Sequence, residues 1–377
     1  MSREFEIVLA CSGLGNVSRG YEASVLDVFK AIQNGENGVR LFRGGSKEKE
    51  GNLCPAVSRN SRLYKLPILR RVSDYRRYWL ENITFLLALV LRISIKPADV
   101  VFTPDHVVAD YLERLRKLIP GKPNIIFSNG APFENEFCKR FKYIHQKSKE
   151  HYHPETAPNS RMFLIGNSFD TDRFRRPSDF NASAFKTTHN LPTDKTIILC
   201  LSALNISHKR VDWIIDETVK LGDGYHLVMC GQEDSETRTL KDHAERSKIT
   251  CTFMTVPSSE VPSLIWASDI MVLGSLSEGF PRVVGEAMAS EVPILIHPHE
   301  NGRWILGEQS PCLVDMTIEG ELAKKIEFWT LGGEPDAETI QANARKVQNE
   351  FSRERVMPKY LEMFEYVGNK NENRISN

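Results

Sequence analysis

The chain has 377 residues, enough for two domains of ordinary size. Its 49 basic and 49 acidic side chains balance, so the chain as a whole has no general attraction for nucleic acid, and we expect no such partner. Seven cysteines occur without a closely spaced pair, and several lie in apolar runs. This distribution indicates reduced core residues of a cytoplasmic protein, and it argues against a disulfide framework or a zinc site.

Short β-branched runs alternate with helical patterns throughout the first half of the chain. Strands are predicted at 5–12, 38–44, 99–104, 124–129, 142–146 and 162–167, and helices near 20–33, 73–93, 106–118 and 132–141. Such alternation is typical of a parallel sheet covered by helices. It predicts an α/β domain with a Rossmann-like, doubly wound sheet over residues 1–170.

The first predicted turn, in CSGLGNVSRGYEASVLDVF, is rich in glycine and lies between a strand and a helix. A dinucleotide-binding fingerprint would need a Gly-x-Gly-x-x-Gly pattern and an acidic residue about 20 positions later. Here the third glycine comes late, at Gly20, and the second strand ends with Arg43. The pattern therefore argues against binding of NAD.

A long apolar stretch with a basic and aromatic start occupies residues 64–93. Its most apolar run, 83–95, is shorter than the ~20 residues of a membrane span and contains Arg92. We favour a buried core helix with a solvated basic face, and the alternative is a peripheral contact with an anionic membrane. The basic and aromatic residues concerned are Arg70, Arg71, Arg76, Arg77, Tyr75, Tyr78 and Trp79.

The polar segment 169–195 interrupts the alternation and predicts a domain boundary. Beyond it, strands are expected at 196–203, 225–231, 249–256, 269–275, 292–297 and 311–316, and helices at 209–221, 235–246, 258–267, 282–290, 301–307, 319–330, 336–350 and 352–367. The series forms a second doubly wound unit, with a domain over 190–350. The tail 368–377 is expected to be disordered.

The stretch SLSEGFPRVVGEAMASEVPILI, residues 275–296, combines a strand end, a tight corner and a helix. Glu278 lies at the carboxyl end of the strand, and Pro281 suits the first turn of a helix, where its missing N–H costs nothing. The unpaired amides of that turn, near 282–285, form a ready site for phosphate. Glu286, one turn into the helix, could accept two hydrogen bonds from a ribose diol.

This stretch, continued to 307, resembles the Glu-x7-Glu nucleotide-sugar signature of the retaining glycosyltransferases of family 4, the glycosyl transferases group 1. LIGNSFDTDRF (164–174) is similar to the family's interdomain signature, and HKRVDWIIDE (208–217) to its KGVDLLIEA segment. The resemblance implies the GT-B fold, in which two Rossmann-like domains face a cleft. It implies an acceptor-binding domain over 1–170, a donor-binding domain over 190–350, and a final helix, 352–367, that packs back on the first.

The resemblance also assigns roles to the residues of the motif. It implies that Glu278 contacts the donor sugar, that the loop amides receive the sugar or the diphosphate, and that Glu286 holds the ribose. Family members usually carry an arginine and then a lysine after the first strand of the donor domain, near the diphosphate. This chain has Ala203 at the arginine position, and Lys209 or Arg210 at the lysine position, of which we favour Lys209. The loop residues implied are Gly279, Phe280, Pro281, Arg282 and Val283.

In the first domain, the RGYE segment resembles the family's Gly-Gly-x-Glu turn. The resemblance implies that the turn brings backbone amides close to the donor phosphate or the acceptor. Gly13, Gly15 and Gly20 are the glycines concerned, and Arg19 is a candidate for the cation that is absent at position 203.

Many family members also carry a histidine near the donor sugar, after the fourth strand of the first domain. In this chain Asn129 stands at that place. His106 follows the preceding strand and is the second candidate, although a lone histidine there is often a neighbour of a helix cap. His145, on the next predicted strand, is a weaker third candidate.

The predicted activity is transfer of a sugar from a nucleotide diphosphate sugar to a hydroxyl of a glycan, lipid-linked or small-molecule acceptor. By resemblance it proceeds with retention of configuration, in polysaccharide, glycolipid or other glycoconjugate synthesis, without a cofactor or metal ion. Asp170-Thr171-Asp172 has the spelling of a metal motif but lies in the interdomain signature. The alternatives are a catalytically silent nucleotide-sugar-binding subunit, a GT-B sugar-nucleotide epimerase and a phosphorylase. The expected location is the cytoplasm, with a peripheral position at the inner face of a membrane if residues 64–93 bind lipid.

Overall fold

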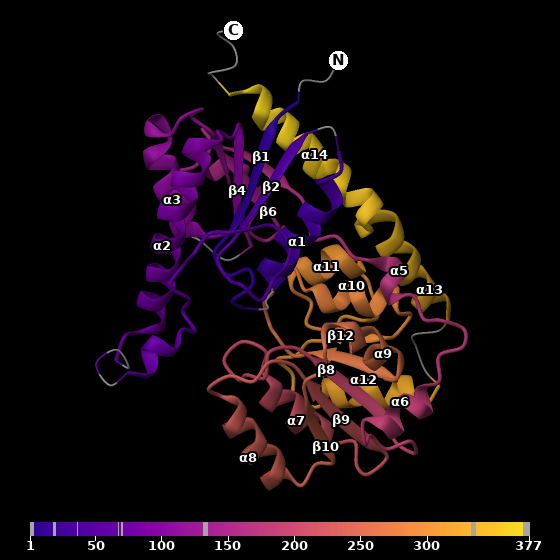
Figure 1. Ribbon diagram of the computed structural model, residues 1–377. Helices are drawn as coiled ribbons and strands as arrows, with labels where there is room; N and C mark the ends of the chain where they lie inside the picture. Colours follow the sequence, from indigo (N-terminus) through magenta and orange to yellow (C-terminus); the bar gives the residue numbers. More distant parts are fainter. Residues whose placement is uncertain are drawn as a thin grey trace. The chain divides into compact units, whose positions relative to one another are not determined.

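The computed structural model of the chain describes residues 4–17, 20–35, 37–66, 68, 71–130, 135–332 and 337–371. The chain divides into two compact units, both of which are layered α/β structures (Figure 1). The first unit consists of Met1–Ser168 with Arg353–Asn377, and the second consists of Phe169–Ser352.

Within the described residues, the first unit contains a seven-stranded sheet in the order β3-β2-β1-β4-β5-β6-β7, in which every neighbouring pair is parallel. The order reverses direction between β1 and β4, so the loops that follow these two strands lie next to each other. The strands are β1 (Glu6–Cys11), β2 (Gly38–Arg43), β3 (Asn52–Leu53), β4 (Val100–Thr103), β5 (Asn124–Asn129), β6 (Tyr143–Gln146) and β7 (Arg161–Leu164).

Helices cover both faces of this sheet because its strands are apolar on both sides. Along β1, Ile7 and Leu9 pack toward one face, while Val8 and Ala10 pack toward the other. The first face is covered by α1 (Gly20–Ile32) and α14 (Arg353–Asn369), and the second by α2 (Asp74–Ile95) and α3 (His106–Leu115). The remaining helical segments are η1 (Arg62–Lys65), η2 (Arg116–Leu118), α4 (Asn135–Cys138) and η3 (Pro154–Thr156).

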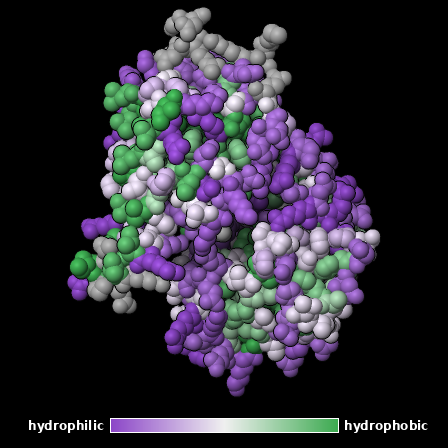
Figure 2. All heavy atoms as spheres, in the orientation of Figure 1, coloured by the Kyte–Doolittle hydropathy of each residue, from purple (hydrophilic) through white to green (hydrophobic). Residues whose placement is uncertain are grey.

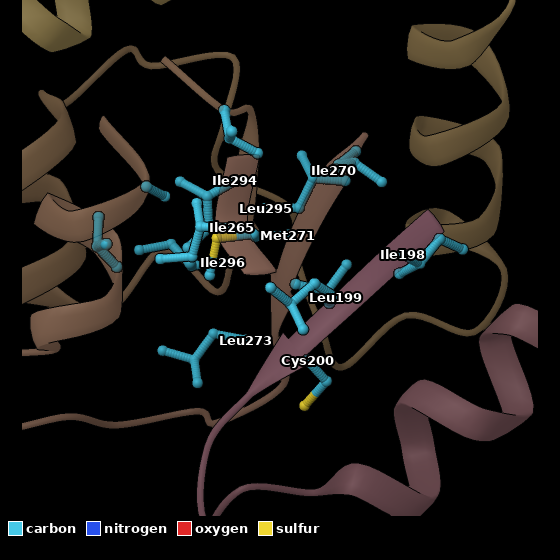
Figure 3. Close-up of a cluster of buried hydrophobic side chains, with 14 of the residues drawn as sticks. Ile198, Leu199, Cys200, Ile265, Ile270, Met271, Leu273, Ile294, Leu295 and Ile296 are labelled. Carbon is cyan, nitrogen blue, oxygen red and sulfur yellow. The ribbon is translucent and has the colours of Figure 1, made fainter. Parts of the chain in front are cut away.

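The second unit contains a five-stranded parallel sheet in the order β10-β9-β8-β11-β12, again counted over the residues described. Its strands are β8 (Thr196–Leu201), β9 (Tyr225–Cys230), β10 (Cys251–Met254), β11 (Ile270–Leu273) and β12 (Ile294–Ile296). Side chains of β8, β11 and β12 gather in the core with Ile265 (Figure 3). The strand order reverses between β8 and β11.

The helical elements of the second unit surround this sheet (Figure 1). They are α5 (Thr171–Phe174), α6 (Ala182–Thr188), α7 (Val211–Val219), α8 (Thr237–Ser247), η4 (Ser258–Glu260), α9 (Val261–Trp266), α10 (Arg282–Ala289), α11 (Glu300–Leu306), α12 (Glu321–Thr330), α13 (Ala337–Lys346) and a π-helical segment, η5 (Val347–Phe351).

Two sequence-based expectations need correction. The expected strand at 311–316 is reduced to a single bridge between Leu313 and Ile296. The polar segment 169–195, predicted as a domain boundary, starts at the first residue of the second unit and contains two short helices, α5 and α6. The tail predicted at 368–377 overlaps the end of α14, and Asn371 is buried with its side-chain amide 3.3 Å from the carbonyl oxygen of Asp99. Residues 372–377 lie outside the described part of the chain.

The helix expected within 64–93, interpreted as a core helix with a solvated basic face, packs on the sheet along one side only. Among the described residues, α2 is the one helix whose length and composition would suit a membrane crossing, and only 33% of its most apolar window is buried. One face of α2 packs on the sheet through Phe85, Leu89 and Ile93, whereas Leu87, Leu91 and Ile95 are exposed.

Candidate functional site

The reversal of strand order in the second unit brings two distant loops together. Lys209 follows β8 and Glu278 follows β11, and these strands are neighbours in the sheet. The ammonium group of Lys209 forms an ion pair and a hydrogen bond with the carboxylate of Glu278. The side chains are 17% and 9% exposed, so the pair is shielded from most solvent. The predicted catalytic candidates Glu278 and Lys209 therefore lie in contact at the carboxyl edge of the sheet.

Local contacts fix Glu278 and its loop in place. The Ser275 hydroxyl donates to the Glu278 carboxylate, and the side-chain amide of Asn301 donates to its backbone carbonyl over 2.7 Å. A side chain at Gly274 would meet the carbonyl oxygens of Lys209 and Arg210 at 3.0 and 3.1 Å, so the two loops approach closely where this glycine stands. The orientation of the carboxylate is thus set by the fold before any ligand binds.

Helix α10 begins at the corner of the same loop. Pro281 is its N-cap residue and makes no side-chain capping bond, so the amides of the first turn are not capped by that residue. Glu286 lies on this helix with its side chain 13% exposed, and the Nε of Arg282 is 3.7 Å from its carboxylate. The helix start combines amides, a guanidinium and a carboxylate, which are groups suited to a phosphate and a diol.

Other loop residues predicted to bind the donor are partly in the core. The ring of Phe280 is buried, stacked on Phe169 at 5.9 Å between centroids and edge-on to Trp304 at 5.4 Å. Val283 is a half-buried residue that packs against the same core. Gly279 is only partly buried at the corner. The side chain of Phe280 therefore anchors the loop, and any ligand contact of this residue would come from its backbone.

Arg210 joins a different segment to the loop after β8. Its backbone is left-handed, with φ of 49°, at the N-cap of α7. Its guanidinium donates to the Met316 carbonyl over 2.8 Å and lies 4.9 Å from the Trp213 ring centre. Of the two cations that the sequence left open, the structure brings Lys209 to the carboxylate and uses Arg210 to join two segments. Ala203 is exposed in the loop after β8.

His299 is a residue of this site that sequence reasoning missed. It is the N-cap of α11, and its Nδ1 accepts a hydrogen bond from the amide of Gly302 at 3.0 Å. Its Nε2 is buried and has no hydrogen-bond partner among the described residues. Burial lowers the pKa of His299 to about 4, while the nearby Glu278 opposes this shift. At neutral pH the ring is therefore uncharged and carries its proton on Nε2.

We expect acid to destabilise the protein through His299. Its pKa in the folded protein lies below its ordinary value of about 6.5, so the stability it contributes is complete above pH 6.5 and is lost as the pH falls toward 4. The substitution His299→Asn keeps a capping acceptor but removes the titration. In urea unfolding at pH 7 and pH 4.5, the wild type should lose about 2.4 kcal/mol more than this variant. Equal losses would contradict the burial of a neutral ring.

In the first unit, the reversal between β1 and β4 creates a second cluster of polar groups. The amide of Ser12 donates to the Asp105 carboxylate over 2.6 Å, and burial raises the pKa of Asp105 to about 6. A cavity of about 460 Å³ opens beside this contact. Its lining includes Tyr21, Glu22, Arg59, Tyr78, Asp105 and His106. Aromatic faces and carboxylates of this kind suit a polyhydroxylated ligand.

Two glycines in the glycine-rich turn of the first unit stand where a side chain would clash with neighbouring groups. A side chain at Gly13 would meet the Glu22 carboxylate at 2.3 Å. Gly15 has φ of 82°, and a side chain there would meet the Gly45 carbonyl at 2.5 Å. Gly20 is the first residue of α1. Arg19 lies outside the described residues.

The candidates His106 and Asn129 line different cavities. His106 begins α3 and borders the larger cavity, with its Nδ1 3.2 Å from the Tyr78 hydroxyl. Burial lowers its pKa, so it is neutral at pH 7. Asn129 is 2% exposed at the end of β5, beside a small cavity of about 40 Å³. His145 is wholly buried, with its ring nitrogens 2.9 Å from the Ser128 hydroxyl and 2.8 Å from the Ile165 carbonyl, and is a core residue.

Comparison with solved structures supports the fold. A sucrose-phosphate synthase from Thermosynechococcus elongatus superposes with a TM-score of 0.79 at 14% identity, covering 96% of this chain and 99% of that one. HepE of Anabaena in complex with UDP-glucose superposes with a TM-score of 0.76 at 14% identity, covering 97% of this chain and 100% of that one. A glycosyltransferase from Rickettsia africae superposes with a TM-score of 0.73 at 16% identity, covering 97% of this chain and 99% of that one. The predicted GT-B class, with two parallel-sheet α/β units, is confirmed.

Sequence comparison addresses the family. No sequence among the curated proteins matches the chain. The family model of the glycosyl transferases group 1 matches residues 182–347, which include Lys209, Glu278 and Glu286. The match to the glycosyl transferases group 1 lies within the second unit and includes the Glu-x7-Glu motif from which the resemblance was predicted.

Proposed function

We propose that the protein transfers a sugar from a nucleotide diphosphate sugar to a hydroxyl group, with retention of configuration, in the synthesis of a polysaccharide, glycolipid or other glycoconjugate. The observation that carries this proposal is the contact of Lys209 with Glu278 beside the start of α10, where Glu286 also lies. These groups could bind the three portions of a nucleotide sugar separately: the diphosphate, the ribose and the transferred sugar. The proposed donor is a UDP-sugar in the first instance, since the similar HepE structure was solved with UDP-glucose.

The proposed roles follow from charge and position. The amides at the start of α10 and the ammonium of Lys209 would bind the diphosphate and stabilise the negative charge that grows on it as the sugar leaves. Glu286 would accept hydrogen bonds from the ribose hydroxyls, and Glu278 would orient the sugar. His299, with its Nε2 proton directed by the cap at Nδ1, is a further donor toward the same ligand.

The proposed acceptor site is the cavity of the first unit beside Asp105 and His106. With no enzymic nucleophile assigned, the departing phosphate would take the proton of the acceptor hydroxyl as the new glycosidic bond forms on the same face of the sugar. No metal ion or cofactor enters this scheme. The acceptor would be a glycan, a lipid-linked sugar or a small molecule, and contact of residues 64–93 with an anionic membrane would place this cytoplasmic enzyme at the inner face of that membrane.

The test is release of free nucleoside diphosphate from a panel of UDP-, GDP- and ADP-sugars, with and without candidate acceptors, in the presence and absence of EDTA. We expect turnover with one nucleotide class, unaffected by EDTA, and the anomeric configuration of the product would establish retention. Binding of a nucleotide sugar without turnover would favour the silent binding subunit. Conversion of the sugar nucleotide without an acceptor would favour an epimerase.

A further inference from the structure

Helix α2 has a second apolar face in addition to the one that packs on the sheet. Leu87, Leu91 and Ile95 follow each other at intervals of four residues, so they share one side of the helix. They are 67%, 62% and 76% exposed, whereas Phe85 and Leu89, on the packed side, are fully buried. A row of large apolar side chains in water is unfavourable unless something covers it.

The same surface continues beyond the N-terminus of α2. Leu66 and Ile68 precede the helix and are 52% and 90% exposed. Figure 2 shows hydrophobic residues gathered along the edge of the molecule over α2. We name these five residues the α2 surface: Leu66, Ile68, Leu87, Leu91 and Ile95.

The chain around the α2 surface is strongly basic although the protein as a whole has no net charge. Residues 59–80 contain seven arginine and lysine side chains and one acidic side chain. Arg59 is paired with the buried Glu81, but Arg62, Arg71 and Arg76 are exposed. The partner of this surface should therefore offer an apolar region for the leucine and isoleucine side chains and negative charges beside it for the arginines. An anionic lipid bilayer has both, in its acyl chains and its headgroups.

Two other arrangements fit the contacts less well. A membrane-spanning α2 would have to give up the packing of Phe85, Leu89 and Ile93 on the sheet, and would expose Glu81, which binds Arg59 and Asn16. A second copy of this chain would bring the same basic segment against itself across a twofold axis, placing like charges together. Neither objection applies to a helix that lies flat on a bilayer.

We propose that the α2 surface docks on anionic membranes, with α2 parallel to the bilayer plane, its apolar row among the acyl chains and Arg62, Arg71 and Arg76 at the headgroups. This inference rests on the membrane contact included in the proposed function, and it adds the face and orientation. It is independent of sugar transfer, because vesicle binding is measured without donor or acceptor.

The test is cosedimentation of the full chain with vesicles of phosphatidylcholine alone or with added phosphatidylglycerol. We expect binding to the anionic vesicles, and weaker binding as salt concentration rises. The pair Leu87→Gln/Leu91→Gln should weaken it roughly tenfold or more. The pair Arg71→Gln/Arg76→Gln should weaken it about fivefold for each side chain. The controls Leu331→Gln, an equally exposed leucine of the second unit, and Arg355→Gln/Lys359→Gln, on α14, should bind as the wild type does.

Circular dichroism and thermal unfolding establish that the variants are folded, and sedimentation equilibrium without lipid measures self-association. Equal binding by the wild type and the leucine pair would overturn the proposal, as would the absence of binding to anionic vesicles. A lipid-free dimer that the same leucine pair dissociates would assign the α2 surface to a second copy instead. Loss of vesicle binding in the variants with unchanged nucleoside diphosphate release would separate membrane docking from catalysis.

Discussion

Glu278→Gln is expected to lower kcat for sugar transfer by about 100- to 1,000-fold, with a smaller effect on the KM of the donor. The glutamine keeps the shape of the side chain and can still accept from Ser275, but it removes the charge that pairs with Lys209. The ammonium then loses the partner that holds it at the carboxyl edge of the sheet. The measurement is the steady-state rate of nucleoside diphosphate release with the donor identified by the panel.

Lys209→Met tests the other member of the Lys209–Glu278 ion pair. It removes the cation proposed to balance the diphosphate, so kcat should fall about 100-fold or more. Because each variant leaves one charge of a shielded pair without its partner, thermal unfolding must be compared in parallel. The matched control is Lys324→Met, which breaks the exposed pair of Lys324 with Glu321 on α12 and should leave both kinetics and unfolding unchanged. Full turnover by either site variant would exclude the assigned role.

The second large effect is expected from Gly285→Ala in the middle of α10. A methyl group there would lie 2.2 to 2.5 Å from three carbon atoms of the Phe169 ring, which is itself held by Phe280 and Phe351. Alanine normally favours a helix over glycine by about 1 kcal/mol, but the clash should outweigh this and destabilise the second unit by about 2 kcal/mol net. Urea unfolding measures the difference.

A matched control exists in the same unit. Gly224 has open space where a side chain would stand and no positive φ, so Gly224→Ala should change the free energy of unfolding by less than about 0.5 kcal/mol. In a Phe169→Leu background the cost of Gly285→Ala should shrink, because the aromatic ring that causes it is gone. If Gly285→Ala lowered the free energy of unfolding by the same amount in that background, the destabilisation would arise elsewhere in α10 and not from the clash with Phe169.

The fold could be predicted from sequence to a large extent because its signals are local. The alternation of apolar runs and helical patterns indicated most strands and helices of both units, and the sequence motif around Glu278 indicated the family. The strand expected at 311–316 failed for a non-local reason. That run is apolar, but only Leu313 meets a neighbouring strand, so no ladder extends along it.

The site was predictable only in part, because its geometry depends on strand order and on single backbone angles. Lys209 and Glu278 are 69 positions apart and meet because β8 lies beside β11. The neighbouring Arg210 has a left-handed backbone and binds the carbonyl of Met316, and no composition pattern reveals either feature. His299 lies within the stretch that resembles the family signature but was given no role there, and its neutral state follows from burial that only the structure shows.

The placement of α14 affects the order in which the protein can form. The core of the first unit includes Tyr360 and Phe364 of α14 beside Leu9 and Val28, so residues from both ends of the chain are required to complete it. The second unit is continuous, from Phe169 to Ser352. During synthesis the second unit has all of its residues before the first one does. One face of the seven-stranded sheet therefore stays uncovered until α14 has been made, so the first unit, although its strands are synthesised before the second unit, is completed after it.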